Sequence, residues 1–95
     1  MTIDLHESDP VRLLGQARRG FSGTVQALIG GNAESSLSAA ELECRLIELG
    51  FVEGARVEVL HEGLIGRDPM ALRIDDMRVA LRRREAQAIL VELAR

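Results

Sequence analysis

The sequence predicts a mainly β protein, a small antiparallel barrel of about five strands with one capping α-helix and a short helical turn before the last strand. After Gly54, apolar and polar residues alternate repeatedly with the period of two that is typical of short strands. A long helical period occurs once, over residues 38–49. Because no second crossover helix is present to build a parallel sheet, we expect antiparallel strands that close on one another and leave no exposed edge.

Composition excludes several classes of protein. The 95 residues are enough for one domain with a modest core. A net charge of −3 gives no general attraction to nucleic-acid phosphates, and only Phe21 and Phe51 could stack on bases or prolines. The single cysteine, Cys44, suits a reducing compartment, and we interpret it as a half-buried small residue. Without a signal peptide or a long apolar run, the sequence indicates a soluble cytoplasmic protein.

The chain divides unequally into two parts. We expect residues 1–19 to be a partly flexible N-terminal extension and residues 20–95 to be the barrel domain. The apolar cluster of Val11, Leu13 and Leu14 within the extension could form a short strand or a turn.

The first barrel strand is expected over residues 21–29, where Gly23 indicates a bulge or bend. The helix should begin at Ser38, which can form a capping box with Glu41. Gly50 should end it in the left-handed conformation. So short a helix is not stable alone, so its apolar stripe must lie on the strands. The stripe contains Ala39, Leu42, Leu46 and Leu49.

The later strands follow in quick succession. The alternation predicts strands over residues 55–61, 70–74, 77–81 and 89–93. The two middle ones form the clearest hairpin, around a tight turn at Asp75-Asp76. We expect residues 64–68 to form a loop and residues 83–88 to form the helical turn.

Four segments together resemble the FeoA family, small cytoplasmic accessory proteins of bacterial ferrous iron uptake. They are Gly20-Phe21-Ser22-Gly23-Thr24-Val25, the run from Arg45 to Val59, Gly66-Arg67-Asp68-Pro69-Met70 and the run from Arg78 to Ala86. The third resembles the family's Gly-Asp-Pro loop with one residue inserted. The resemblance covers roughly Gly20 to Leu93. Leu49 and Glu53 depart from the Met and Pro that are usual there.

Family membership would imply an SH3-like barrel that works beside a large membrane-embedded ferrous iron transporter with a GTPase domain. The same barrel also occurs as the last domain of metal-dependent repressors, so the fold alone does not decide the function.

The sequence gives little support to catalysis. His6 and His61 are the only histidines, and neither belongs to a grouping with a nucleophile. We therefore predict no enzymatic activity, no catalytic residues, no cofactor and no metal site. His61, Glu62 and Asp68 offer at most a weak metal site, because dedicated sites bring three or four ligands together at close spacing.

Two features could serve binding. We interpret Arg82-Arg83-Arg84 as the solvated face of the last hairpin rather than as a site for RNA or an acidic partner. Leu64 and Ile65 lie in a glycine-flanked loop, where they could either enter the core or form a docking patch. The predicted partner-binding residues are Leu64, Ile65, Arg67 and Asp68, extended by Arg45 and Glu48.

The leading hypothesis is a non-enzymatic accessory protein that contacts the cytoplasmic GTPase part of a ferrous iron transporter. It would bind no nucleic acid and would reach the membrane only through this partner, and its strand edges could support weak self-association. The alternative is a metal-responsive regulatory module, related to the SH3-like domain of metal-dependent repressors, that binds a transition metal ion.

Overall fold

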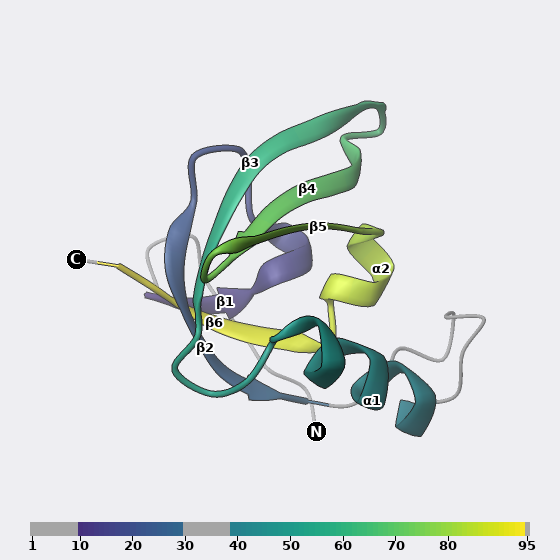
Figure 1. Ribbon diagram of the computed structural model, residues 1–95. Helices are drawn as coiled ribbons and strands as arrows, with labels where there is room; N and C mark the ends of the chain where they lie inside the picture. The colour runs from purple at the N-terminus through teal and green to yellow at the C-terminus, as the bar shows by residue number, and fades with distance from the viewer. Residues whose placement is uncertain (1–9, 30–38, 95) are drawn as a thin grey trace.

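The computed structural model describes residues 10–29 and 39–94. The described chain forms one antiparallel six-stranded sheet in the order β1-β6-β2-β3-β4-β5, with helices beside it (Figure 1). The predicted mainly β fold is therefore confirmed. The elements in chain order are β1 (Val11–Leu13), η1 (Leu14–Gln16), β2 (Ser22–Leu28), α1 (Ala39–Leu49), β3 (Arg56–Ile65), β4 (Asp68–Ile74), β5 (Met77–Leu81), α2 (Arg83–Ala86) and β6 (Ile89–Leu93).

The sheet curls around a common core without closing into a complete barrel. β1 and β5 are its edges, and in the described part of the chain no ladder joins them. Six strands are present instead of about five. The additional strand is β1, which pairs with β6 in the register Val11↔Glu92 and Leu13↔Leu90. Three residues are too few to show an alternating period, which is why the sequence left this segment open between a strand and a turn.

The sheet and core begin before Gly20, where the domain was expected to start. Leu14 and Ala17 are fully buried in the core. The backbone N–H of Gly20 donates a hydrogen bond of 2.9 Å to the carbonyl of Val59, which continues the packing of this segment onto β3. The N-terminal boundary is therefore corrected to the start of β1. The expected flexibility of residues 1–9 lies outside the described residues.

Helix α1 lies on the sheet through its leucine stripe. Leu42 and Leu46 are fully buried and Leu49 packs at the margin of the core, whereas Ala39, at the first position of the helix, is exposed. The helix ends as predicted. Gly50 has φ = 106°, and the N–H of Phe51 donates to the carbonyl of Leu46 at 2.9 Å. The expected cap at Ser38 lies outside the described residues.

The core fills the inside of the curled sheet. Phe51 is its largest fully buried side chain. The other large members include Leu14, Leu42, Leu46, Met70, Leu72, Ile74, Leu81 and Ile89. The alternation predicted for residues 70–74 and 89–93 is confirmed, because the inward-facing side chains of β4 and the first half of β6 are buried. None of the described helices is long and apolar enough to cross a membrane.

Strand β3 is longer than predicted. It continues to Ile65, so the expected loop over residues 64–68 is wrong. The pairing Ile65↔Asp68 leaves only Gly66 and Arg67 in the turn, with φ values of 66° and 60°. Positive φ at both central residues is typical of the type I′ turns that join hairpins. Register shifts between Val59/His61 and between Glu62/Ile65 interrupt the alternation, which concealed the second half of the strand.

The other turns agree with the sequence more closely. β4 and β5 pair around Asp75-Asp76 as predicted, and the carboxylate of Asp75 accepts a hydrogen bond of 3.0 Å from the N–H of Arg56. α2 supplies the predicted helical turn. The bulge expected at Gly23 does not occur there. The register shift in β2 lies between Val25 and Ala27, and Gly23 is needed because a Cβ there would overlap the Glu92 carbonyl of β6.

Candidate functional site

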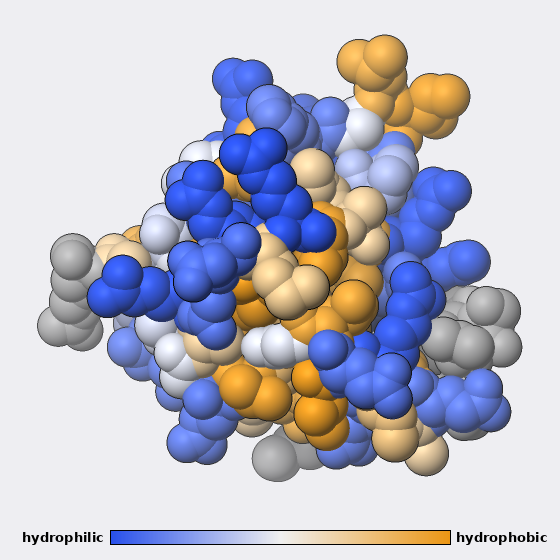
Figure 2. Space-filling view, in the orientation of Figure 1, coloured by the Kyte–Doolittle hydropathy of each residue, from blue (hydrophilic) through white to orange (hydrophobic). Residues whose placement is uncertain are grey.

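The tip of the β3–β4 hairpin carries two fully exposed aliphatic side chains. Leu64 and Ile65 have relative exposures of 102% and 88%. The hairpin projects beyond the curled sheet, and hydrophobic surface is visible at its tip at the upper right of Figure 2. Both faces of the strand are in solvent there, so neighbouring residues are exposed together. Leu64 and Ile65 are therefore surface residues rather than core residues, which decides between the two alternatives that the sequence left open.

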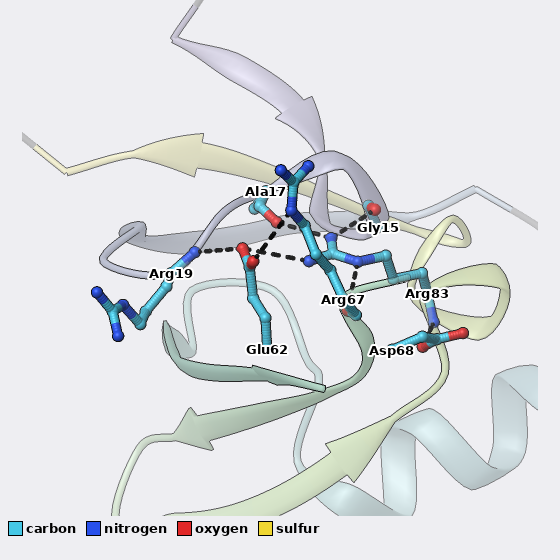
Figure 3. Close-up of polar contacts among 7 residues, drawn as sticks. All are labelled: Gly15, Ala17, Arg19, Glu62, Arg67, Asp68 and Arg83. Carbon is cyan, nitrogen blue, oxygen red and sulfur yellow. Dashed lines mark hydrogen bonds and ion pairs between the residues drawn. The ribbon is translucent and has the colours of Figure 1, made fainter. Parts of the chain in front are cut away.

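Arg83, at the start of α2, ties the turn end of this hairpin to the body of the protein (Figure 3). Its Nε donates to the carbonyl of Arg67 at 2.8 Å, and its Nη1 donates to the carbonyls of Gly15 and Ala17 at 3.0 and 2.8 Å. Its backbone N–H donates to the carboxylate of Asp68 at 2.9 Å. One side chain therefore links α2, the hairpin and the segment before β2, which fixes the direction in which the hairpin tip points.

The interpretation of the arginine run as a solvated face is wrong for its middle member. The side chain of Arg83 is only 18% exposed, whereas Arg82 and Arg84 are exposed. The three residues are identical in type, so nothing in the local sequence distinguishes the buried one. Its partners lie 15 to 68 positions away in the chain, and only the fold brings them together.

Glu62 is the acidic centre of the same region. Its carboxylate accepts a hydrogen bond of 2.7 Å from the backbone N–H of Arg19, and it forms ion pairs with Nη2 of Arg83 at 3.3 Å and with Nε of Arg67 at 3.6 Å. The Arg19 hydrogen bond lowers the pKa of Glu62, and the guanidinium groups of Arg83, Arg67 and Arg18 lower it further against the opposing effect of desolvation. We call Glu62, Arg19, Arg67 and Arg83 the Glu62 cluster.

The lowered pKa of Glu62 predicts an acid-sensitive contribution to stability. Because the folded pKa lies below the unfolded one, the contribution is complete above the pKa of an ordinary glutamate and is lost as the pH falls through the folded pKa. Glu62→Gln should be less stable than the parent at neutral pH, and the difference should shrink toward pH 3. Urea unfolding over this range measures it. Glu48→Gln, at an exposed position of α1, controls for the loss of one charge. A difference independent of pH would contradict the prediction.

The six predicted contact residues fall into separate groups. Leu64, Ile65 and Arg67 lie together at the hairpin tip and are exposed. Asp68 lies behind them, where one oxygen of its carboxylate accepts the backbone N–H of Arg83.

The two α1 residues are separated from the tip. Arg45 forms an ion pair of 2.8 Å with Glu85 of α2, and α2 lies between α1 and the hairpin in Figure 1. Glu48 is exposed on the same helix. The structure therefore does not bring these two side chains to the hairpin tip.

The disfavoured metal site is not assembled. Glu62 and Asp68 are bonded to groups of arginine residues, and within residues 10–29 and 39–94 no three His, Cys, Asp or Glu side chains form a group that could hold a metal ion. Cys44 is exposed on α1, so its interpretation as half-buried is wrong. It falls on the side of the helix that faces away from the leucine stripe.

Six strands curl about one core, and a helix packs beside them. This arrangement defines a small SH3-like domain. Its projecting apolar tip makes it a candidate binding module. The chain belongs to the FeoA family, because the family model described as FeoA domain matches residues 12–93. The resemblance to this family is thereby confirmed, and it extends further toward the N-terminus than Gly20. Membership places the chain among the accessory proteins of ferrous iron transport.

Solved structures agree with this assignment. FeoA from Stenotrophomonas maltophilia complexed with zinc, a prokaryotic SH3 domain protein, is 29% identical over 83% of this chain and 87% of that one, with a TM-score of 0.66. FeoA from Chlorobium tepidum is 27% identical over 88% and 71% of the two chains, with a TM-score of 0.70. A manganese-dependent transcriptional repressor is 25% identical over 92% of this chain and 44% of that one, with a TM-score of 0.70. No curated protein matches the chain.

Proposed function

We propose that this protein is a non-enzymatic, cytoplasmic accessory protein of bacterial ferrous iron uptake. It binds the cytoplasmic GTPase domain of the ferrous iron transporter through the hairpin tip and reaches the membrane only through that partner. Family membership supports the role in iron transport. The observation that carries the contact is the full exposure of Leu64 and Ile65 at the end of a projecting hairpin.

The energetics favour such a contact. Covering a Leu or Ile side chain completely contributes about 1.5–3 kcal/mol per residue. The tip is also preorganised, because the turn follows a type I′ geometry and Arg83 holds the carbonyl of Arg67 and the carboxylate of Asp68. A partner therefore has little conformational entropy to remove on binding. Arg67 lies beside the aliphatic pair and would extend the contact, with Arg45 and Glu48 of α1 as its outer part.

The test measures the affinity of the purified chain for the GTPase domain of the transporter from the same organism. The double variant Leu64→Ser with Ile65→Ser should weaken binding by about 100-fold or more, because it removes roughly 3 to 6 kcal/mol of apolar burial and about 1.4 kcal/mol corresponds to a tenfold change in affinity. Its free energy of unfolding should stay within about 0.5 kcal/mol of the parent, since both side chains are exposed. Isothermal titration calorimetry and urea unfolding provide the two measurements.

The control is Met77→Ser. Met77 is 58% exposed but lies at the first residue of β5, at the opposite end of β4 from the tip. It should bind like the parent. Absence of binding by the parent at high micromolar concentration, together with normal iron uptake in a deletion strain, would contradict the proposed function.

The alternative is a metal-responsive regulatory module. It is supported by the likeness to the manganese-dependent repressor and by the zinc in the Stenotrophomonas maltophilia protein. Calorimetry with ferrous, manganous and zinc ions separates the two functions. Micromolar affinity that disappears in Cys44→Ala or His61→Ala would favour this alternative. Weak self-association stays a prediction, with the edges of β1 and β5 as the surfaces concerned.

A further inference from the structure

The hairpin tip stands beside an unusual concentration of positive charge. The chain as a whole carries a net charge of −3. Around the turn end of the hairpin, however, the Glu62 carboxylate is within electrostatic reach of Arg18, Arg67 and Arg83, and its hydrogen-bond donor is the backbone of Arg19. Four arginines thus share this region with the two carboxylates of Glu62 and Asp68. The local charge has the opposite sign to that of the whole chain.

Within the described residues, Glu62 pairs with the guanidinium groups of Arg67 and Arg83 and not with those of Arg18 and Arg19. Its oxygens are used by the Arg19 backbone and by the side chains of Arg67 and Arg83. In Figure 3 the Arg19 side chain extends away from Glu62. Arg18 and Arg19 are exposed, and both also line a surface hollow whose other lining residues include no carboxylate. Their guanidinium groups therefore remain available to an anionic partner.

The distances along β3 separate the apolar and the basic parts. Ile65 lies three positions beyond Glu62 in β3, and their partners Asp68 and Met70 are two positions apart in β4, so the separation is roughly 7 to 10 Å. A partner surface that receives Leu64 and Ile65 therefore meets the arginine side chains at this distance from the tip, closer to the body of the protein. A partner surface complementary to this arrangement has an apolar socket with acidic residues on its rim. A polar rim around an apolar centre is common at protein interfaces.

We propose, resting on the proposed function, that the partner surface is an apolar socket rimmed by Asp or Glu carboxylates. Leu64 and Ile65 enter the socket, and Arg18 and Arg19 face the carboxylates. Complementary charge of this kind accelerates encounter and selects the partner. A protein socket meets only this basic face, whereas an anionic bilayer extends beyond it and would repel the remainder of an acidic chain.

The experiment measures binding to the GTPase domain as a function of salt. The double variant Arg18→Gln with Arg19→Gln removes two positive charges and keeps the Arg19 backbone bond to Glu62. At about 20 mM salt it should bind roughly 3- to 30-fold more weakly than the parent, as expected for two exposed ion pairs. The difference should nearly vanish at about 0.5 M salt, where the charges are screened.

Arg78→Gln is the matched control. Arg78 is an exposed arginine of β5, opposite Arg73 at the far end of β4 from the tip, and its variant should bind like the parent at every salt concentration. Equal weakening by this control would overturn the inference, because it would make the effect one of net charge rather than of this face.

The remaining outcomes separate the inference from the proposed function. If the parent does not bind the GTPase domain, the proposed function fails. If it binds with an affinity that neither salt nor the arginine double variant changes, the acidic rim is wrong and the proposed function stands. Retention on vesicles of anionic phospholipid without the GTPase domain, lost in the Leu64/Ile65 and Arg18/Arg19 variants, would also overturn the acidic socket and assign this face to the membrane.

Discussion

Leu46→Ala should lower the free energy of unfolding by about 2 to 5 kcal/mol, the range observed when a packed leucine site is emptied. Leu46 is fully buried and belongs to the same core cluster as Leu42 and Phe51. Its backbone also closes the helix, since its carbonyl accepts the N–H of Phe51. A helix of 11 residues is marginal in isolation, so this packing is what holds α1 in place. Urea unfolding of the parent and the variant provides the measurement.

The matched control is Ile47→Ala in the same helix. Ile47 is 46% exposed, so the same reduction in size should cost well under half as much. Equal losses at the two positions would mean that helix destabilisation, rather than core packing, sets the effect. A loss below about 0.5 kcal/mol at Leu46 would mean that α1 does not lie on the sheet.

Elements with an uninterrupted hydrophobic period were predictable from the sequence. The leucines of the α1 stripe, the glycine stop at Gly50 and the hairpin of β4 and β5 all follow from local spacing, and the structure confirms them. β1 has only three residues, too short for a period. The second half of β3 was missed because two register shifts break its alternation, so that its residues resemble a loop.

The candidate site, like the fold, was predictable only in part from the sequence. The glycine-flanked segment around Gly66 indicates Leu64 and Ile65 as a possible contact, and the structure shows that both side chains are exposed. The role of Arg83 was not recognisable, because it depends on carbonyls of Gly15 and Ala17 that lie far away in the sequence. Hydrogen bonds between distant backbone and side-chain groups leave no periodic pattern, whereas amphipathic faces do.

Gly63→Ala should destabilise the protein by about 3 kcal/mol, at the upper end of what overpacking costs. Gly63 lies in β3 opposite the start of β4, where a Cβ would overlap the carbonyl group of Asp68 and approach the nitrogen of Pro69 to 2.8 Å. These neighbours are backbone atoms of the paired strand, so they cannot move aside as a flexible side chain would. The two strands must separate, which moves the hairpin tip and weakens the Arg83 bond to Asp68.

Gly66→Ala provides the comparison within the same hairpin. Gly66 has φ = 66° and no atom within 4 Å of the added Cβ, so alanine should cost only about 1 kcal/mol through backbone strain. Thermal and urea unfolding of both variants measure the contrast. The affinity for the GTPase domain should fall more in Gly63→Ala than in Gly66→Ala, because only the former disturbs the strand pairing that orients Leu64 and Ile65. Equal stability of the two variants would show that the strands yield at this point and that the tip is not rigidly held.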